Sequence, residues 1–461
     1  MKRLAFMAMM ACLFLLIAPV ANAEVRELSY SAGPVTVGPY QVKQSFIGAP
    51  QPAKDFGEGF VTSMEVDVAD AAGNPIPISR LMLHHIVFLN LARKDNTCGS
   101  FTNWDSATKL PGAERFYGGG EERIKVTFPP GYGYRVRPSD PWALNYMFMN
   151  HRNRTDRGYI KYRMTYDTDP TLKEVKPYWL DVKNCLADPV FDVPGGGKRG
   201  STYRKSATFT FPEAGRLVAG GGHVHGGAKN LRVSRADCGN SEIHSSMPTW
   251  GPRRHPFYNV RPILHEPGPI NMTGFTSAKG VPVAAGERLR LDANYDNQFV
   301  HTRVMGINVV YLAPDASVRE KCGAMPDDLA VTPRPTGRQL SPRFKVPIVG
   351  IRGGRARDIK APPGRRVRVR SGSTINVGDL FFRRPNVAVG SGSTLRWLFD
   401  GPTLHNVTVA DGPRGFSSRN LSNSRAYRTK LKKPGTYKLF CALHPVDMTA
   451  TVKVLPKPKR R

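Results

Sequence analysis

The stretch FCALHPVDM at residues 440–448 decides the fold of the C-terminal part of this chain. Together with His405 it supplies one thiolate (Cys441), two imidazoles (His405 and His444) and one thioether (Met448). This is the ligand set of a type 1 (blue) copper centre, a trigonal His₂Cys site with a weak axial methionine. Such a site takes one ligand from a neighbouring strand and three from a tight loop. The order of the residues follows that arrangement and predicts a type 1 copper centre.

The residues around these ligands are typical of β-strands. Residues 393–399 and 407–409 are rich in strand-forming side chains, and residues 433–440 form a turn that leads into a strand. The segment from Asn376 to Leu455 resembles the cupredoxins of the plastocyanin and pseudoazurin type. The resemblance implies a Greek-key β-sandwich for this part of the chain.

The N-terminus has the pattern of a secretory signal peptide. Residues 1–23 begin with Lys2 and Arg3, continue with an apolar segment and end in a small-residue cleavage site at Ala23. No later segment approaches the roughly 18 apolar residues that a transmembrane helix needs. We therefore expect a secreted, periplasmic or cell-envelope protein without a transmembrane anchor, in an oxidising compartment.

The cysteines support this location. If Cys441 binds copper, four cysteines remain after the signal peptide, and an even set in an exported chain predicts two disulfides. Three connectivities are open. We favour Cys98 with Cys185 and Cys238 with Cys322, because each pair would then lie within one expected domain.

Composition limits the partners. The 67 Lys and Arg residues outnumber the 36 Asp and Glu residues, which gives a formal charge of +31. Export argues against nucleic acid as the partner, and anionic envelope surfaces or an acidic redox partner fit the charge better. The many short strand-like runs, broken by 45 glycines and 39 prolines, favour β-sandwiches over helical packing.

Two histidine pairs stand out upstream. His223 and His225 lie at i and i+2 among glycines, so in a strand they share one face and can bind one metal ion. His84 and His85 are adjacent within an apolar strand, so shared coordination would need local twisting or a bulge. The structural alternative makes His84 an exposed residue and His85 a hydrogen-bonded core histidine.

With Met305, these pairs resemble the copper type II, ascorbate-dependent monooxygenases, the family of peptidylglycine and dopamine hydroxylases. The resemblance spans roughly residues 80–314. It implies two jelly-roll-like β-sandwiches that face each other across a cleft, each with one type 2 copper. His223, His225 and Met305 would hold the oxygen-site copper, whereas His84 and His85 would hold the electron-transfer copper.

The chain departs from that family at two places. The third ligand of the electron-transfer copper falls on Met147; it could instead be His151, or the site could be incomplete. The positions of the family's substrate-binding Arg and Tyr are occupied by Gly221 and Val309, which disfavours a peptidylglycine substrate. Two further histidines, His265 and His301, are reserve ligands.

The sequence as a whole predicts an all-β protein with two jelly-roll-like sandwiches followed by a Greek-key cupredoxin sandwich. The expected order is a signal peptide (1–23), a first monooxygenase-like sandwich (24–190), a second one (191–325), a Pro/Arg-rich linker with or without the first cupredoxin strand (326–372), the cupredoxin domain (373–457) and a basic tail (458–461).

The expected function is copper redox chemistry, with one type 1 copper and up to two type 2 coppers, and with a small reductant or a protein as electron donor or acceptor. The sequence leaves two interpretations open. The first is a copper-dependent monooxygenase with a built-in electron-transfer domain. The second is a non-catalytic copper-binding electron shuttle in which only the cupredoxin site is redox active.

Overall fold

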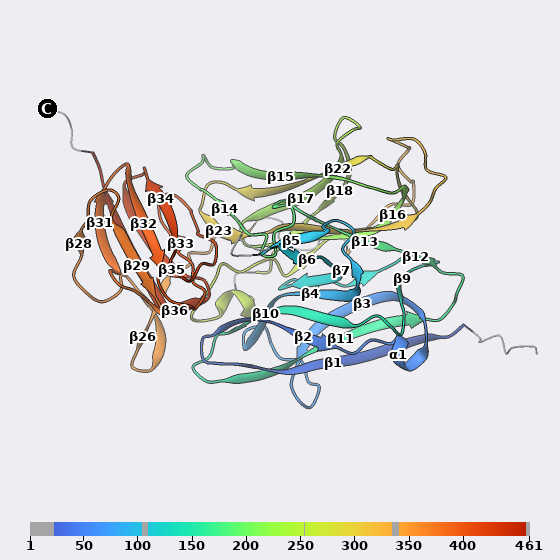
Figure 1. The fold of residues 1–461 in the computed structure, drawn as a ribbon, viewed down its shortest axis with the longest axis horizontal. Coiled ribbons are helices and arrows are strands. Elements are labelled where there is room, and N and C mark those ends of the chain that lie inside the picture. Colours follow the sequence, from blue (N-terminus) through green and yellow to red (C-terminus); the bar gives the residue numbers. More distant parts are fainter. Residues whose placement is uncertain (1–22, 104–108, 253, 334–340, 458–461) are drawn as a thin grey trace, which may run out of the picture.

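The structure, a computed structural model, describes residues 23–103, 109–252, 254–333 and 341–457, and these form three β-sandwiches (Figure 1). The helical elements of this part are α1 (Ala53–Phe56) and η1 (Pro256–Asn259). The all-β prediction is therefore confirmed. Among the described residues, no helix has the length and apolar character needed to cross a bilayer. Residues 1–22 of the expected signal peptide and the basic tail 458–461 lie outside the described residues.

The first sandwich packs a sheet of order β1-β11-β3-β9-β12, with β8 beside β3, against a sheet of order β2-β10-β4-β7. Strand β11 shows why these segments form a sandwich, since Ile160, Tyr162 and Met164 alternate with polar residues and enter the core. The strands are β1 (Val25–Val37), β2 (Val42–Ala49), β3 (Gly59–Ala69), β4 (Leu81–Lys94), β7 (Ala113–Gly120), β8 (Val126–Thr127), β9 (Tyr132–Val136), β10 (Trp142–Asn150), β11 (Asp156–Asp167) and β12 (Lys173–Glu174).

The second sandwich packs a sheet of order β13-β24-β16-β21-β25 against one of order β15-β22-β17-β18. Its strands are β13 (Lys176–Asp181), β15 (Thr202–Thr210), β16 (Gly215–Val224), β17 (Ala228–Arg235), β18 (Ser241–Ser246), β21 (Gly274–Val283), β22 (Arg288–Asp296), β24 (Gly306–Pro314) and β25 (Ala330–Thr332). The small ladders are β5 (Ser100–Thr102) with β6 (Lys109–Pro111), β14 (Phe191–Val193) with β23 (His301–Val304), and β19 (Pro248–Thr249) with β20 (Asn271–Met272).

The two sandwiches share one apolar interface. Val218 and Tyr311 of the second sandwich belong to the same buried cluster as the core of the first. The Tyr311 hydroxyl also donates to the backbone carbonyl of Phe116 at 3.0 Å. Side chains from both sandwiches therefore pack together in one buried interface.

The boundary between these sandwiches differs from the expected position at residue 190. Strand β13 precedes that position, yet it pairs along its length with β24 of the second sandwich. The second sandwich thus begins at β13, directly after β12, which pairs with β9 of the first.

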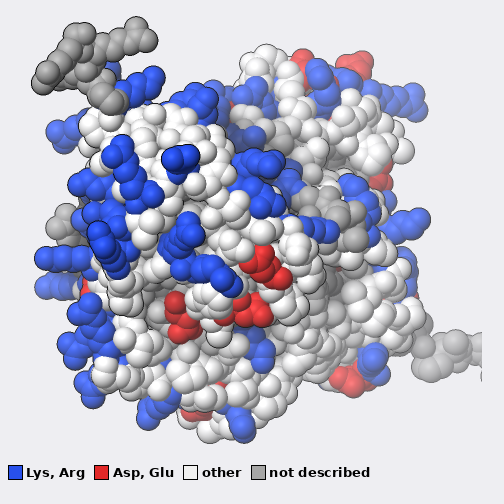
Figure 2. Space-filling view, turned by 60° about the vertical axis from the view of Figure 1, so that its left-hand side comes forward, with Lys and Arg blue, Asp and Glu red and all other residues white. Residues whose placement is uncertain are grey.

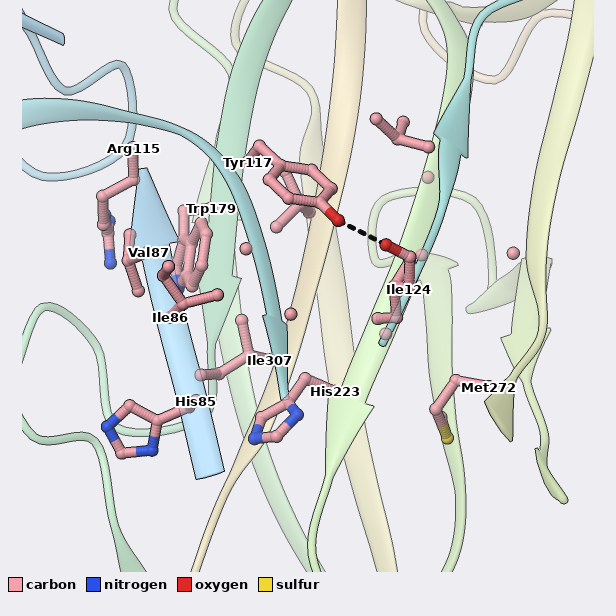
Figure 3. A pocket seen from close by; sticks show the side chains of 18 of the residues that line it. His85, Ile86, Val87, Arg115, Tyr117, Ile124, Trp179, His223, Met272 and Ile307 are labelled. Carbon is pink, nitrogen blue, oxygen red and sulfur yellow. Dashed lines mark hydrogen bonds between the residues drawn. The ribbon is translucent and has the colours of Figure 1, made fainter. Parts of the chain in front are cut away.

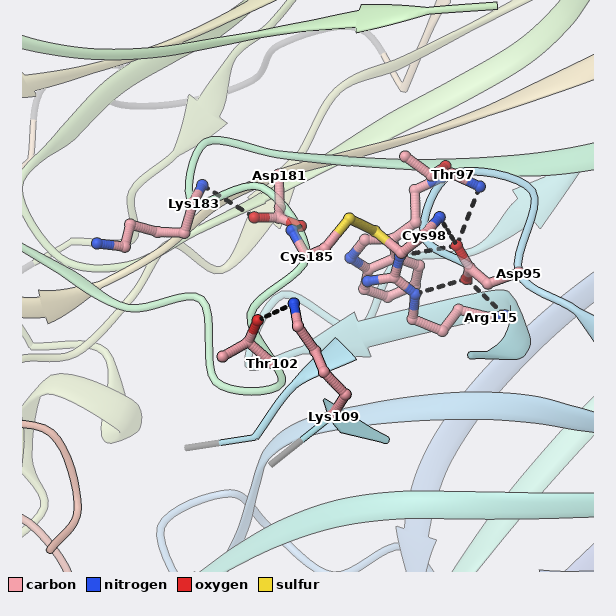
Figure 4. The surroundings of a disulfide bond; sticks show 10 residues. Asp95, Thr97, Cys98, Thr102, Lys109, Arg115, Asp181, Lys183 and Cys185 are labelled. Carbon is pink, nitrogen blue, oxygen red and sulfur yellow. Dashed lines mark hydrogen bonds and ion pairs between the residues drawn. A yellow bond between two sulfur atoms is a disulfide. The ribbon is translucent and has the colours of Figure 1, made fainter. Parts of the chain in front are cut away.

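Both expected disulfides are present, Cys98–Cys185 and Cys238–Cys322. Because Cys185 follows β13, the first of them links the two sandwiches, which corrects the reason for which this pairing was favoured. Figure 4 shows how its surroundings are tied: Asp95 accepts the backbone N–H of Cys98 at 2.7 Å and forms an ion pair with Arg115 at 2.8 Å. The disulfide is thus a covalent anchor of the sandwich interface.

The third sandwich lies at one end of the molecule (Figure 1) and packs a sheet of order β28-β31-β36-β35-β33 on one of order β30-β29-β32-β34. Its strands are β28 (Val367–Arg368), β29 (Thr374–Gly378), β30 (Phe381–Phe382), β31 (Asn386–Gly390), β32 (Ser393–Phe399), β33 (Thr408–Asp411), β34 (Arg425–Leu431), β35 (Gly435–Cys441) and β36 (His444–Leu455).

The region expected to be a linker has structure of its own in its described part. Strand β25 extends the second sandwich, and β28 belongs to the third. Between them, β26 (Ile348–Arg352) and β27 (Arg355–Ile359) form a hairpin whose Ile348 and Ile359 pack on Phe440 of the third sandwich. Residues 334–340 lie outside the described residues.

Candidate copper centres

The C-terminal ligands converge at one end of the third sandwich. Cys441 ends β35, His444 and Met448 lie on β36, and His405 lies just before β33. The Nδ1 atoms of His405 and His444 lie 3.1 Å apart and are 3.9 and 3.8 Å from the Cys441 Sγ atom. Met448 is fully buried in the same core cluster as Cys441. A thiolate and two imidazole nitrogens that face a common point fit a single soft transition metal such as copper.

Asn406 holds this ligand loop in place. Its backbone N–H donates to the Cys441 sulfur at 3.3 Å, and its side-chain oxygen accepts the N–H of Ala442 at 2.8 Å. These bonds join the segment that carries His405 to the loop that carries the other ligands. Such outer partners fix the orientation of metal ligands.

The electrostatics of the site suit metal binding. Burial raises the pKa of the Cys441 thiol. Burial also lowers the pKa of His405, and it lowers that of His444 to about 4. Both imidazoles are therefore neutral near pH 7 and offer a lone pair, whereas the thiol needs a bound cation to favour its thiolate form.

A bulge brings the first upstream histidine pair to one side of its strand. In the pairing of β10 with β4, Met147 lies opposite His85 and Phe148 lies opposite Leu83, so His84 is the extra residue. The two imidazoles consequently meet, with their Nδ1 atoms 3.0 Å apart. Shared coordination by adjacent strand residues needs local twisting or a bulge, and this strand contains a bulge.

The second pair meets the first across the sandwich interface. His223 lies on β16 and His225 directly follows that strand, and their ring centroids are 5.1 Å apart. The ring centroid of His84 is 5.0 Å from that of His225 and 4.8 Å from that of His265. We call His84, His85, His223, His225 and His265 the histidine cluster.

The cluster is a single group to which both sandwiches contribute. Under the resemblance stated above, each sandwich would hold its own copper across a cleft, but here His84 has close neighbours from the second sandwich. One set of donors is already mixed: His84, Glu121 and His265 each place a ligand atom within 4.8 Å of the others. Glu121 also accepts the Gly268 N–H at 2.6 Å, which ties the loop after β7 to the loop that carries His265.

The rings of the second pair are oriented as metal ligands usually are. His223 Nδ1 is 2.8 Å from a carboxylate oxygen of Glu122, and the ring of His225 bonds to the backbone carbonyl of Arg303. Their Nε2 atoms are buried and have no hydrogen-bond partner in the described part of the chain. A histidine with one nitrogen held by a carboxylate or carbonyl and the other free is the common form of a metal ligand. The cluster therefore fits copper.

The pKa values in the cluster follow from burial and neighbouring charges. Burial, the neighbouring His223 and the Arg303 guanidinium lower the pKa of His85 to about 3. Burial and the neighbouring histidines also lower the pKa of His84 and His225. Burial alone would lower the pKa of His223, but the Glu122 carboxylate outweighs it and raises that pKa.

The remaining expected ligands lie around this cluster. Met305 is buried against Trp179 and lines a cavity beside His223 as well as a smaller one beside His225. Met147 lines the smaller cavity together with His84 and His85. His151 is buried with its ring 6.4 Å from that of His265, and its Nδ1 has no hydrogen-bond partner among the described residues.

Sequence reasoning missed the carboxylates of the cluster. Glu121 and Glu122 stand next to each other in an ordinary polar turn after β7, and nothing in their spacing indicates a contact with histidines more than 100 positions away. His265 was a reserve ligand and joins the cluster. His301, the other reserve, instead forms an ion pair with Glu266 at 2.8 Å.

A small cavity of about 90 Å³ lies where the histidine cluster meets the third domain. His84, His85 and His225 line it from the sandwiches, and Ala442 and Leu443, next to Cys441, line it from the third domain. Residues of the two metal-binding regions therefore lie close together around this cavity.

The domain contact beside this cavity is made by β23. Thr302 Oγ1 donates to the Val409 carbonyl at 2.8 Å, and the Arg303 guanidinium donates to the Ser418 carbonyl at 3.2 Å. Burial lowers the pKa of His85 and raises that of Cys441, and the Arg303 guanidinium is a smaller influence that acts downward on both pKa values. Its φ of 53° is an uncommon backbone conformation for a residue other than glycine.

Comparisons with known proteins find relatives of the C-terminal domain and relatives of about half of the chain. Residues 369–455 match the family described as copper binding proteins, plastocyanin/azurin family. These residues form a cupredoxin domain. The chain is also 30% identical over 79 residues to amicyanin-alpha of Methylorubrum extorquens, which covers 16% of this chain and 66% of that protein. The resemblance of the C-terminal segment to cupredoxins is confirmed.

Two fungal relatives match about half of the chain. One, named probable copper-dependent oxygenase M1, from Phoma sp., is 26% identical over 227 residues, which is 47% of this chain and 51% of that protein. The other, named probable copper-dependent oxygenase clz3, from Cochliobolus lunatus, is 26% identical over 241 residues, which is 47% of this chain and 64% of that protein. The chain thus spans between about half and two thirds of the length of these relatives.

Proposed function

We propose that the protein is an exported copper-dependent oxygenase of the monooxygenase type, in which the cupredoxin domain passes single electrons to the histidine cluster. The observation that carries the proposal is the small cavity shared by both metal-binding regions, with Cys441 next in the chain to the residues that line it. Copper bound at the cluster would supply one-electron exchange and the activation of dioxygen. The names of the fungal relatives support the same chemistry.

Individual residues orient the histidines of the cluster and fix the position of the cupredoxin domain. Glu122 holds His223 so that Nε2 faces the cluster, and the Arg303 carbonyl holds His225 in the same way. The bonds of Thr302 and Arg303 to the cupredoxin domain keep the two regions at a constant separation. We assign Met305, with its thioether, to the oxygen side of the cluster, because soft thioether ligands favour Cu(I).

The source of electrons is a small reductant or a redox protein. Lys and Arg are spread over the face seen in Figure 2, while Asp and Glu form a small patch near its centre and a few further spots toward its edges. A predominantly basic surface attracts acidic partners and anionic envelope polymers. Two disulfides suit an oxidising compartment, and we place the protein outside the cytoplasm on that basis and on its N-terminal pattern.

Reoxidation of the blue chromophore tests this proposal. The full-length protein, loaded with copper and reduced, is mixed with oxygenated buffer, and the return of the visible absorbance is followed. In the wild type we expect oxygen to restore the colour rapidly. In the His223→Ala/His225→Ala double variant we expect at least a tenfold slower return, because the electron acceptor is lost. His255→Ala, outside the cluster, is the matched control.

The same experiment decides between the enzyme and the electron shuttle. Equal reoxidation rates in the wild type and the double variant would show that electrons leave the cupredoxin without the cluster, and the shuttle interpretation would replace the oxygenase. Copper stoichiometry and electron paramagnetic resonance on the same samples show whether type 2 copper occupies the cluster. A single blue copper in the wild type would likewise contradict the oxygenase.

A further inference from the structure

A large cavity lies between the two upstream sandwiches and ends at the histidine cluster. Its volume is about 670 Å³, within the range of small-molecule sites. Strands β4 and β7 line it from the first sandwich, and β16 and β24 line it from the second. Figure 3 shows His85 and His223 at the same end of this cavity, with Tyr117 and Trp179 farther along. A bound molecule would therefore reach the metal-binding side chains.

The walls are mainly apolar and aromatic. Trp179, Ile124, Met272 and Ile307 are among the side chains that form them (Figure 3). The hydroxyl of Tyr117 also belongs to the wall, but its proton is donated to the Ile124 carbonyl at 2.5 Å. These surfaces favour an apolar occupant.

Three charged residues of the lining, Arg115, Arg123 and Asp188, form ion pairs within the protein. Arg115 forms an ion pair with Asp95 and lies over the rings of Phe101 and Trp179. The other two pairs of the lining are Arg123 with Asp67 and Asp188 with Arg303. Lys125 also belongs to the lining but is exposed to solvent. Burying a charged ligand without a partner is costly, so the interior selects against ions.

Three polar atoms of lining residues lack a hydrogen-bond partner among the described residues, namely His223 Nε2 and the side-chain oxygens of Asn145 and Asn271. All three atoms are buried. Buried polar atoms usually have partners, and each of these amides can accept a hydroxyl proton. The cavity is thus apolar with a few places for neutral hydrogen-bonding groups.

Two positions of the cavity wall have no polar side chain. Gly221 and Val309 both line the cavity. A Cβ atom added at Gly221 would have Ile124 Cγ2 as its nearest neighbour at 3.9 Å, an ordinary van der Waals contact. Neither Gly221 nor Val309 has a side chain that can bind an anion, and Gly221 leaves space for a ligand.

We propose that this cavity binds a bulky, uncharged, largely aromatic substrate that carries hydroxyl groups, with one end placed at His85 and His223. The chemistry at His85 and His223 rests on the proposed function, whereas binding of the substrate does not need copper. The two can therefore fail separately.

Displacement of a neutral fluorophore tests the proposal. Nile red is titrated into the copper-free and copper-loaded full-length protein and is then displaced with 2-naphthol, 2-naphthoate or hippurate. We expect Nile red to bind in both forms and 2-naphthol to displace it at least tenfold better than either carboxylate. Failure of Nile red to bind, or displacement by the carboxylates as good as by 2-naphthol, would overturn the proposal.

Glycine variants locate the binding. Gly221→Leu places its side chain in the cavity and should weaken Nile red binding at least tenfold, whereas Gly48→Leu, on an exposed strand position, should not change it. Gly119→Leu, whose Cβ would also meet only contacts of 3.7 Å or more, is the second variant if the first does not fold. Wild-type affinity in a folded cavity variant would refute the assignment. Loss of oxygen chemistry with intact Nile red binding would instead refute only the proposed function.

Discussion

Replacement of Glu122 by Gln should weaken copper binding at the histidine cluster without affecting the blue site. The Glu122 side chain is fully buried, and one of its oxygens is 2.8 Å from His223 Nδ1 and accepts the Gly120 N–H at 3.0 Å. Glutamine keeps the size of the side chain and can still accept both hydrogen bonds. It removes the negative charge, however, and that charge makes the His223 imidazole a stronger ligand for copper. Losing such a partner typically lowers metal affinity about 10- to 100-fold, which corresponds to roughly 1.4–2.7 kcal/mol.

Competition with a chelator measures this effect. Copper is removed stepwise from the wild type and from Glu122→Gln, while electron paramagnetic resonance follows type 2 copper and visible absorbance follows the blue centre in the same sample. We expect the type 2 signal of the variant to disappear at about 10- to 100-fold lower chelator concentration, with the blue band unchanged. The internal blue band controls for general unfolding, and Glu213→Gln, on the surface, controls for loss of a carboxylate.

Two outcomes would refute this reasoning. If Glu122→Gln retains type 2 copper within twofold of the wild type while His223→Ala loses it, the carboxylate does not support the metal. If the blue band is lost in parallel with the type 2 signal, the variant has damaged the fold, and the contact between Glu122 and His223 is structural.

The other predictions concern the cysteines. Cys441→Ser should abolish the intense visible band, because only a thiolate gives that charge-transfer colour, while circular dichroism shows the upstream sandwiches still folded; survival of the colour would contradict the ligand assignment. Removing the Cys98–Cys185 disulfide should cost about 2–4 kcal/mol of unfolding free energy, measured by denaturant unfolding, and should also loosen type 2 copper because this bond joins the two sandwiches. Removing Cys238–Cys322, within the second sandwich, should lower stability by a similar amount but leave type 2 copper in place; equal copper loss in both variants would count against the anchoring role.

Several features of the protein were predictable because they depend on local geometry. Cys441, His444 and Met448 lie within eight consecutive residues, so the turn between two strands is sufficient to bring them together. His223 and His225 share a strand face for the same reason. The even cysteine count led to the correct pairing, although the bond Cys98–Cys185 crosses between sandwiches rather than staying within one.

The domain boundary was not predictable at the same level. Nothing in the residues of β13 distinguishes a last strand of one sandwich from a first strand of the next, since a strand that is buried along almost its whole length could pack in either. Its assignment depends on which neighbour it pairs with, and β24 lies more than 100 residues further along the chain. Strand pairing over such separations is a tertiary property.

Local sequence patterns are sufficient to identify side chains suited to binding copper and the β-strands that carry them. Only the tertiary structure decided that His84 meets His225 and His265, that Glu121 and Glu122 enter the cluster, and that residues of the cupredoxin loop line a small cavity beside it. The physical reason is the range of the interactions. Strand periodicity and turns fix positions over a few residues, whereas burial of the apolar interface between the sandwiches brings together groups whose separation in the chain carries no signal.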